Sequence, residues 1–384
     1  MLSIDHIVGK ARSGMLRTRA GEIPVPFFMP DATRAAVRGV TPEEIRNAGT
    51  PALVVNTYHL MLAPGEGLIA QAGGIRPFMG WSGPVLSDSG GYQVYSLIHR
   101  NPEMGKITED GAEFRSVLDG SKRLLTPERA IAIQFDLGVD MMVVLDDPRP
   151  NDAPRGEIAE AVERSIRWAR RCRDEFERQV AARGLTEETR PLLFGVVQGG
   201  PFPELRTRCA EGLVEIGFDG YGFGGRHVDS EGNFLADIVS HTASVIPEER
   251  VRFALGVGTP EDIVRFHHVG WDMFDCVIPT REGRHGRLFR WNGVIPRLET
   301  VKTGHAPSLP EESSYETINI NNSRFAEDFA PIDPGCDCPL CTNHSAAYLH
   351  HLFRVSDPLG GRLASIHNLR FYARLMETLR EEGR

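Results

Sequence analysis

The chain has 384 residues, of which 41% are hydrophobic and 25% are charged, and its formal net charge at pH 7 is −9. This composition is that of an ordinary globular protein, and it excludes a disordered chain, a collagen and a coiled coil. An overall basic coat for nucleic acid is excluded too, but a local basic surface is not, because phosphate binding depends on where the charge lies.

The start of the chain, Met-Leu-Ser-Ile-Asp-His, has no basic segment followed by an apolar stretch, so no export signal is expected. No apolar run approaches the ~20 residues that a membrane span needs. The length favours one large domain with an appendage, or two modest domains. We therefore expect a cytoplasmic protein.

Eight short apolar segments recur along the chain, each ending in a polar residue or glycine. They are residues 26–33, 53–58, 85–91, 141–147, 193–200, 220–225, 252–258 and 273–279. Helix-type patterns lie between them, and three of these open with Thr-Pro, an N-cap followed by proline at the first helical position. The three are residues 41–45, 126–138 and 258–270, and residues 155–180 have the spacing of an amphipathic helix. Apolar strands that alternate with helices predict a parallel sheet, and eight such units predict an α/β fold, the (β/α)8 TIM barrel.

Polar side chains stand at the ends of these predicted strands, where the catalytic residues of a barrel enzyme lie. They are Asp88, Asp146, Asp147, Gln198 and Asp275, and Gly225 ends another of the predicted strands. So many carboxylates at strand ends indicate a functional role for them, because burying a charged group in a protein core costs free energy. The alternative for each single aspartate is that it caps the next helix.

The pattern changes after residue 290. Residues 297–316 are polar and rich in Pro, Ser and Glu, which predicts a surface insertion or a mobile loop. Residues 357–381 have helical spacing and fit the eighth barrel helix. We therefore expect a barrel with the active site over residues 1–290, an insertion with a zinc-binding subdomain over 291–356, and the last barrel helix over 357–384.

Three cysteines, Cys336, Cys338 and Cys341, lie within six residues, which favours metal binding over a disulfide framework. Three thiolates and one imidazole make a closed tetrahedral zinc site, which is structural because no position is left for water. The spacing leaves four candidates for the fourth ligand, namely His344, His350, His351 and His367.

Five blocks occur in one order: DSGGYQ (88–93), VVQGG (196–200), GVG (256–258), DMFDCVIPTREGRHG (272–286), and CDCPLC (336–341) with a distant IHN (366–368). Together they resemble the tRNA-guanine transglycosylases, which exchange a base during queuosine biosynthesis. The resemblance spans nearly the whole chain. It implies a tRNA substrate with guanine at the wobble position, a 7-deazaguanine base as co-substrate, one structural Zn²⁺ per chain, no organic cofactor, no membrane and a homodimer.

By this resemblance, Asp275 is the nucleophile that attacks C1′ of the ribose, and Asp88 is the general acid/base. Exchange of a base on the same ribose without energy input suggests two displacements through a covalent ribosyl–enzyme intermediate, as in retaining glycosidases. The leaving guanine needs a proton and the incoming base must lose one, so one carboxyl group can serve both halves.

Base recognition is expected from four further positions that match the family. Guanine presents two adjacent donors, N1–H and the 2-amino group, which suit the carboxylate of Asp146. The side-chain amide of Gln198 and the backbone N–H of Gly225 suit the acceptor O6. Tyr92 is expected to stack on the extruded base, which must leave its stack to be reached.

The resemblance also assigns tRNA contacts to Arg281 and Arg284 and selects His367 as the fourth zinc ligand. The two arginines belong to a basic patch that includes Arg287 and Arg290. The alternative for such a charge run is an ordinary solvated face.

Several positions depart from the bacterial family pattern. They are Asp147, Pro148, Arg226, His227 and Leu255, and they bear on which base is inserted. Val228 stands where the queuine-using enzymes tend to have glycine, and its branched side chain favours the smaller 7-aminomethyl-7-deazaguanine. The segment Leu-Asp-Asp at 145–147 and Pro148 point instead to queuine.

Three other functions are alternatives to this one. A metal-dependent barrel hydrolase requires histidines at several strand ends, and no predicted strand ends in His-x-His. A non-catalytic RNA-binding subunit is favoured by loss of Asp275 or Asp88, and both are present. A relative that acts on DNA stays open.

Overall fold

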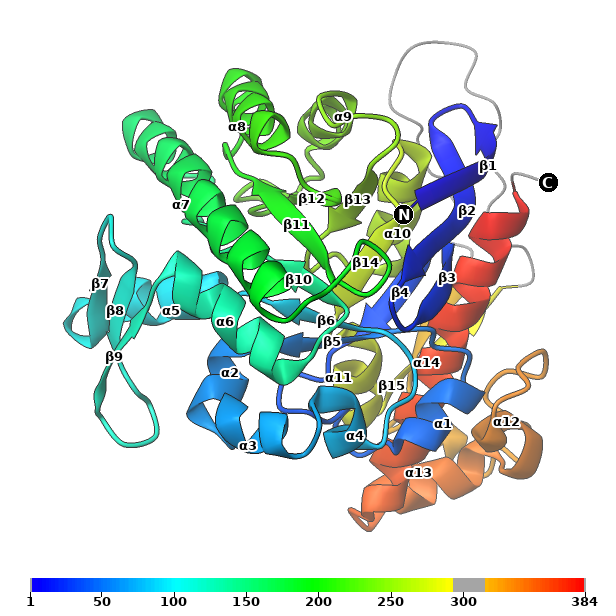
Figure 1. Ribbon diagram of the computed structural model, residues 1–384. Helices are drawn as coiled ribbons and strands as arrows, with labels where there is room; N and C mark the ends of the chain where they lie inside the picture. Colours follow the sequence, from blue (N-terminus) through cyan, green and yellow to red (C-terminus); the bar gives the residue numbers. More distant parts are fainter. Residues whose placement is uncertain (1, 293–314, 383–384) are drawn as a thin grey trace.

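The computed structural model describes residues 2–292 and 315–382, so nearly all of the predicted loop at 297–316 lies outside the described residues. Its centre is a closed barrel of eight parallel strands, which confirms the predicted fold class (Figure 1). In order around the barrel they are β4 (Phe27–Pro30), β5 (Leu53–Asn56), β6 (Val85–Asp88), β10 (Met141–Val143), β11 (Leu192–Val197), β12 (Gly220–Phe223), β13 (Val251–Ala254) and β14 (Met273–Cys276). β14 pairs with β4, and the N–H of Ala32 donates to the carbonyl of Val54 (2.7 Å) to close the ring.

Helices surround the barrel and include the predicted ones. The α-helices are α1 (Pro42–Asn47), α2 (Thr57–Leu62), α3 (Glu66–Gln71), α4 (Ile75–Met79), α5 (Gly91–Arg100), α6 (Pro127–Leu137), α7 (Arg155–Ala182), α8 (Pro203–Ile216), α9 (Ala236–Ser244), α10 (Pro260–His268), α11 (Ile278–Arg284), α12 (Pro339–Asn343), α13 (Ala346–Arg354) and α14 (Pro358–Glu381). Two short 3₁₀ helices are η1 (Pro102–Met104) and η2 (Ser323–Phe325). The side chains of Thr41, Thr126 and Thr259 each accept the backbone N–H three residues later, so all three Thr-Pro signals mark helix starts.

Three antiparallel sheets accompany the barrel and were not predicted. They consist of β1 (Leu2–Val8), β2 (Ala11–Thr18) and β3 (Gly21–Val25); of β7 (Gly105–Ile107), β8 (Ala112–Arg115) and β9 (Lys122–Leu125); and of β15 (Arg287–Trp291) and β16 (Tyr315–Asn319). Arg12 of β2 forms an ion pair with Asp272, which precedes β14, and Arg19 donates to Asp140, which precedes β10 (2.9 Å). The first sheet therefore covers the N-terminal end of the barrel, and the predicted strand-end residues Asp88, Asp146 and Asp275 lie at the opposite end.

The C-terminal part has a second, smaller core. It contains Leu288, Ile318, Ile320, Phe325, Ile332, Cys336, Cys338, Leu340, Cys341, Ala346, Leu349, Leu352, Leu363 and Ala364. α14 joins this core to the barrel, since the ring of Tyr372 lies 4.7 Å from that of Phe28 in β4. Among the described residues, no helix has both the length and the apolar character that a membrane crossing requires.

Candidate active site

Asp275 lies near the C-terminal end of β14, in register with Met29 of the neighbouring strand β4. The backbone N–H of Gly256 donates to Oδ1 of Asp275 (2.8 Å), which leaves Oδ2 available for another partner. Burial, together with the negative charges of Asp88 and Asp31, raises the pKa of Asp275 to about 7. A carboxylate of this kind is a poorly solvated oxygen nucleophile that ionises near neutral pH.

Asp88 ends β6 and faces the same end of the barrel. Asn56 is its partner in the register of β5 and β6, and Nδ2 of Asn56 donates to Oδ2 of Asp88 (2.8 Å). The side chain of Gln93 and the backbone of Ser89 and Gly90 also hydrogen-bond to this carboxyl group. Burial outweighs these bonds and raises the pKa of Asp88 to about 6, which suits a group that gains and loses a proton near neutrality.

Asp146 and Gln198 contact each other directly, since Nε2 of Gln198 donates to Oδ2 of Asp146 (2.6 Å). Burial is the main reason that the pKa of Asp146 rises to about 7, and the charges of Asp88 and Asp147 add to it. Gly224 and Gly225, which follow β12, lie against the side-chain amide of Gln198. A methyl group on Gly224 would lie 2.4 Å from Nε2 of Gln198, and Gly225 has φ +89°, a conformation that favours glycine. The two predicted base-binding side chains and Gly225 are therefore together.

Tyr92 lies on α5, which begins just after β6, and its side chain is 59% exposed at this end. It is thus the one aromatic group among the predicted site residues with a face open to a ligand. An exposed aromatic ring beside buried carboxyl groups is suited to stacking on a base.

The predicted basic patch divides into paired and unpaired groups. Arg281 donates to Glu282 (3.1 Å), Arg287 lies 3.5 Å from the same carboxylate, and Arg290 pairs with Glu316. Arg284 has no ion pair within the described chain. Burial and the nearby charges of Arg38 and Arg281 lower the pKa of Arg284, although the charge of Asp31 opposes them.

Arg34 and Arg38 are basic groups that the sequence analysis did not consider. Both are exposed on the segment after β4, next to the strand that carries Asp275, and neither has an ion pair within the described chain. Ala35 between them has φ +59°, which is uncommon for a residue with a side chain. The signal in the sequence that could have identified them is a pair of arginines, four residues apart, just after a predicted strand.

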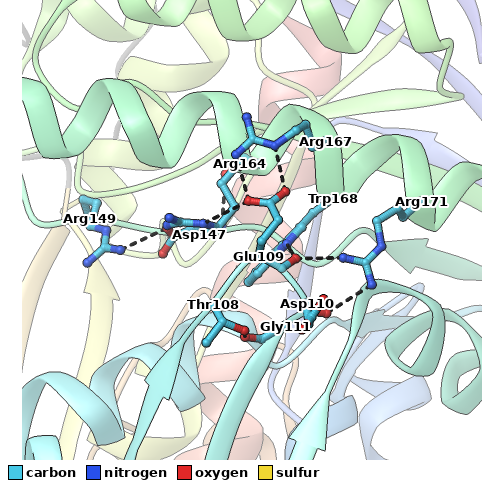
Figure 2. A network of polar contacts seen from close by, with 11 residues as sticks. Thr108, Glu109, Asp110, Gly111, Asp147, Arg149, Arg164, Arg167, Trp168 and Arg171 are labelled. Carbon is cyan, nitrogen blue, oxygen red and sulfur yellow. Dashed lines mark hydrogen bonds and ion pairs between the residues drawn. The ribbon is translucent and has the colours of Figure 1, made fainter.

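Asp147 fixes the segment that carries Asp146 (Figure 2). Its side chain is fully buried, and its Oδ2 accepts from Arg164 of α7 (2.5 Å) and from Arg149 (3.0 Å). The loop before β8 is held to the same helix, because the carboxylate of Glu109 binds Arg167 through two hydrogen bonds of 2.7 and 2.8 Å. This network is a support for the site, and its arginines come from parts of the sequence that no motif singled out.

The three cysteines and His367 form one buried group. Nδ1 of His367 lies 3.4 Å from Sγ of Cys338 and 3.3 Å from Sγ of Cys341, and all four ligand atoms lie within 4.8 Å of one another. A tetrahedral zinc site has ligand atoms about 3.5–3.8 Å apart. Nε2 of His367 bonds to the carbonyl of Phe289 (2.7 Å), which orients the ring with Nδ1 toward the thiols. The group is fit to hold one metal ion.

The other candidate histidines are engaged elsewhere. Nδ1 of His350 bonds to the carbonyl of Ile320 (2.7 Å), and the ring of His344 stacks on that of Tyr348 at 4.9 Å. His351 is exposed on α13. Of the four histidines that the spacing left open, the structure brings His367 to the cysteines.

Comparison with known proteins gives the family. The profile of the family described as queuine tRNA-ribosyltransferase matches residues 6–382. The chain belongs to this family. Proteins named queuine tRNA-ribosyltransferase from Aliivibrio fischeri (strain MJ11), Idiomarina loihiensis and Shewanella halifaxensis are 42%, 41% and 42% identical to it. These matches cover 97%, 98% and 98% of this chain and 90%, 91% and 91% of the relatives. The predicted family is confirmed, and the family is one of enzymes, the tRNA-guanine transglycosylases, which transfer a pentosyl group and act on tRNA.

Proposed function

We propose that this chain exchanges the wobble guanine of tRNA anticodons for a 7-deazaguanine base, through a covalent ribosyl–aspartate intermediate, in queuosine biosynthesis. The observation that carries the proposal is the pair of carboxyl groups at the catalytic end of the barrel. Asp275 and Asp88 have pKa values raised to about 7 and about 6, and the charge of Asp88 contributes to the raised pKa of Asp275. Two such carboxyl groups are what a retaining exchange at C1′ requires.

In the first half of the reaction, an oxygen of Asp275 attacks C1′. The new C1′–O bond forms as the bond from C1′ to N9 of guanine breaks, and Asp88 gives its proton to the departing base. In the second half, N9 of the incoming base attacks C1′, the aspartate leaves, and Asp88 takes the proton that the base loses. The Gly256 N–H that holds Oδ1 of Asp275 stabilises the carboxylate when it leaves.

Base recognition falls to Asp146, Gln198 and Gly225. The carboxylate of Asp146 takes N1–H and the 2-amino group, and the amide of Gln198 with the N–H of Gly225 takes O6. The direct bond between Gln198 and Asp146 supports this assignment, because it shows that both side chains point to one place. Tyr92 stacks on the base.

The exchange of labelled guanine into nucleic acid tests the proposal. We expect incorporation into tRNA that has guanine at the wobble position, and none into DNA of the same sequence or in the absence of nucleic acid. A denaturing gel should show an adduct between tRNA and the protein. Exchange into DNA at an equal rate, or an inert protein with intact folding, would contradict the proposed substrate or reaction.

For the incoming base we propose 7-aminomethyl-7-deazaguanine rather than queuine, because Val228, three residues after Gly225, carries a branched side chain that leaves less room for a bulky substituent than a glycine would. When the two bases compete for one tRNA, we expect the aminomethyl base to be incorporated preferentially, and Val228→Gly to reduce that preference. A clear preference of the parent protein for queuine, unchanged in Val228→Gly, would reverse this assignment.

We propose that Arg284 and Arg281 bind phosphates of the anticodon loop, and that Arg38 is a third arginine that does so. Removing one phosphate contact reduces the slope of log affinity against log salt by about 0.7–0.9. We expect this reduction for Arg284→Ala and Arg38→Ala and a smaller one for Arg281→Ala, because Glu282 already binds Arg281. Arg17→Ala, on the sheet at the other end of the barrel, is the control. Equal slopes in all four variants would show that these groups are a solvated face.

The metal is proposed to be Zn²⁺, because three thiolates and one imidazole are a preferred ligand set of this ion. We also propose that the protein works in the cytoplasm as a homodimer. Phe329 and Tyr348, which are 82% and 38% exposed, lie on neighbouring segments of the C-terminal part, because the backbone N–H of Ala347 donates to the carbonyl of Asp328. Exposed apolar side chains of this kind are suited to a subunit contact. Sedimentation measurements test the oligomeric state.

A further inference from the structure

One side chain connects the loop after β10 with the loop after β12. We call residues 225–235, which follow β12, the rim loop. Nδ2 of Asn151 donates to the carbonyl oxygens of Arg226 (3.0 Å) and Val228 (3.1 Å). Because both partners are acceptors, the NH₂ group of the amide must face them. Oδ1 then faces away, and it is buried without a hydrogen-bond partner in the described part of the chain.

The rim loop has other fixed points, and they lie on its far side. Nε2 of His227 bonds to Oδ2 of Asp262 at the start of α10 (3.1 Å), and the ring of His227 packs edge-on against Phe266 at 5.4 Å. Val228 also pairs with Phe234 within the loop. His227 therefore ties the loop to α10, whereas Asn151 is its side-chain tie to the segment that carries Asp146.

Asn151 also lies beside the base-binding groups. A methyl group on Gly225 would be 4.0 Å from Oδ1 of Asn151 and 3.8 Å from Oε1 of Gln198. On guanine, O6 and position 7 lie on the same edge of the ring system. A base whose O6 is held by Gln198 and Gly225 thus presents its substituent at position 7 beside Gly225 and the residues that follow it.

We propose that Asn151 is a positioning residue that determines which substituent at position 7 of the base is accepted. By holding the carbonyls of Arg226 and Val228, it fixes the backbone that the substituent meets. The inference rests on the proposed function. Guanine has no substituent at this position and meets the rim loop only at Gly225, so its exchange is expected to be independent of Asn151.

Two variants test this role. Asn151→Asp keeps the shape of the side chain but offers no N–H to the two carbonyls and repels them, and Asn151→Ala removes the group. We expect guanine exchange into tRNA to stay within about twofold of the parent in both. We expect the ratio of kcat/KM between 7-aminomethyl-7-deazaguanine and the bulkier queuine to change at least tenfold, in the same direction in both variants.

Asn233→Ala is the matched control, because Asn233 lies on the same loop but its side chain bonds only to Asp229 and Glu231 within that loop. It should leave the ratio unchanged. An unchanged ratio in both Asn151 variants, or guanine exchange that falls in parallel with exchange of the other bases, overturns the inference. Absence of guanine exchange in the parent protein is a separate result, and it overturns the proposed function together with this inference.

Discussion

Asp275→Asn should show no detectable base exchange and, at the same time, a more stable fold at pH 8. The amide cannot form the bond to C1′, but its oxygen can still accept the N–H of Gly256 that holds Asp275. The variant should therefore fold and bind tRNA as the parent does. On a denaturing gel, the adduct between tRNA and protein should be absent.

The gain in stability follows from the raised pKa of Asp275, about 7 in the fold against an ordinary value of 3.8. The folded state binds this proton more tightly than the unfolded state, so the contribution of Asp275 to stability is full below about pH 4 and is lost as the pH rises to about 7. A neutral asparagine avoids this loss, which amounts to about 1–4 kcal/mol at pH 8. Denaturant unfolding at pH 4 and pH 8 measures it, and the two proteins should differ little at pH 4.

A control with the opposite sign is Asp219→Asn. Asp219 lies just before β12 and accepts two hydrogen bonds from Arg190, at 2.7 and 2.8 Å. The pKa of Asp219 is lowered through Arg190, although burial opposes this, so its replacement should reduce stability at pH 8 and leave base exchange in place. Base exchange by Asp275→Asn would contradict the proposal that Asp275 is the nucleophile. Equal stability of Asp275→Asn and the parent protein at pH 8 would show that the carboxyl group of Asp275 is well solvated.

The barrel could be predicted from the sequence because each of its strands is a continuous apolar run that ends at a polar residue or glycine. The additional sheets could not, because their strands lack a continuous apolar run and are partly exposed. Lys122–Leu125 of β9, for example, has three exposed residues out of four and no apolar alternation. Such strands form because they pair with one another in the fold, which is information that the local sequence does not contain.

The strand-end rule located Asp88, Asp146 and Asp275, but not the groups that tune them. Asn56 follows an apolar strand and precedes a helix, so it has the pattern of an N-cap. The structure confirms that role, since its Oδ1 accepts the N–H of His59, yet its Nδ2 also holds Asp88. The difference between Arg281 and Arg284 could not be predicted either. Glu282 is close in sequence to both arginines, and only the fold shows that it pairs with Arg281.

The fourth metal ligand shows where spacing alone fails. Four histidines follow the cysteines, and the nearest, His344, is only three residues from Cys341. The histidine that joins the cysteines is the most distant, His367, because α14 returns past the cysteine loop and presents this residue from its buried face. Only the resemblance to the family selected it from the sequence.

Loss of the metal should unfold the C-terminal part first and reduce base exchange as a consequence. His367 is on α14, and this helix supports α11, which follows Asp275. Nδ2 of Asn368 donates to the carbonyls of Pro279 and Arg287 (2.9 Å each), and a methyl group on Gly283 would lie 2.7 Å from the backbone nitrogen of Ser365. The metal group thus secures the helix that packs behind Asp275.

Cys338→Ser tests this dependence, since it removes one thiolate and should lower the metal content from about one ion per chain to near zero. Protease should then cut first between residues 315 and 357, while the barrel core stays protected, and exchange should fall because α11 loses its support. His350→Ala is the matched control: this buried side chain bonds to the carbonyl of Ile320, a residue of the same small core, but it does not belong to the metal group. It should lose some stability and keep its metal. A metal-free Cys338→Ser protein with the parent's melting temperature, protease pattern and activity would show that the second core stands without the ion.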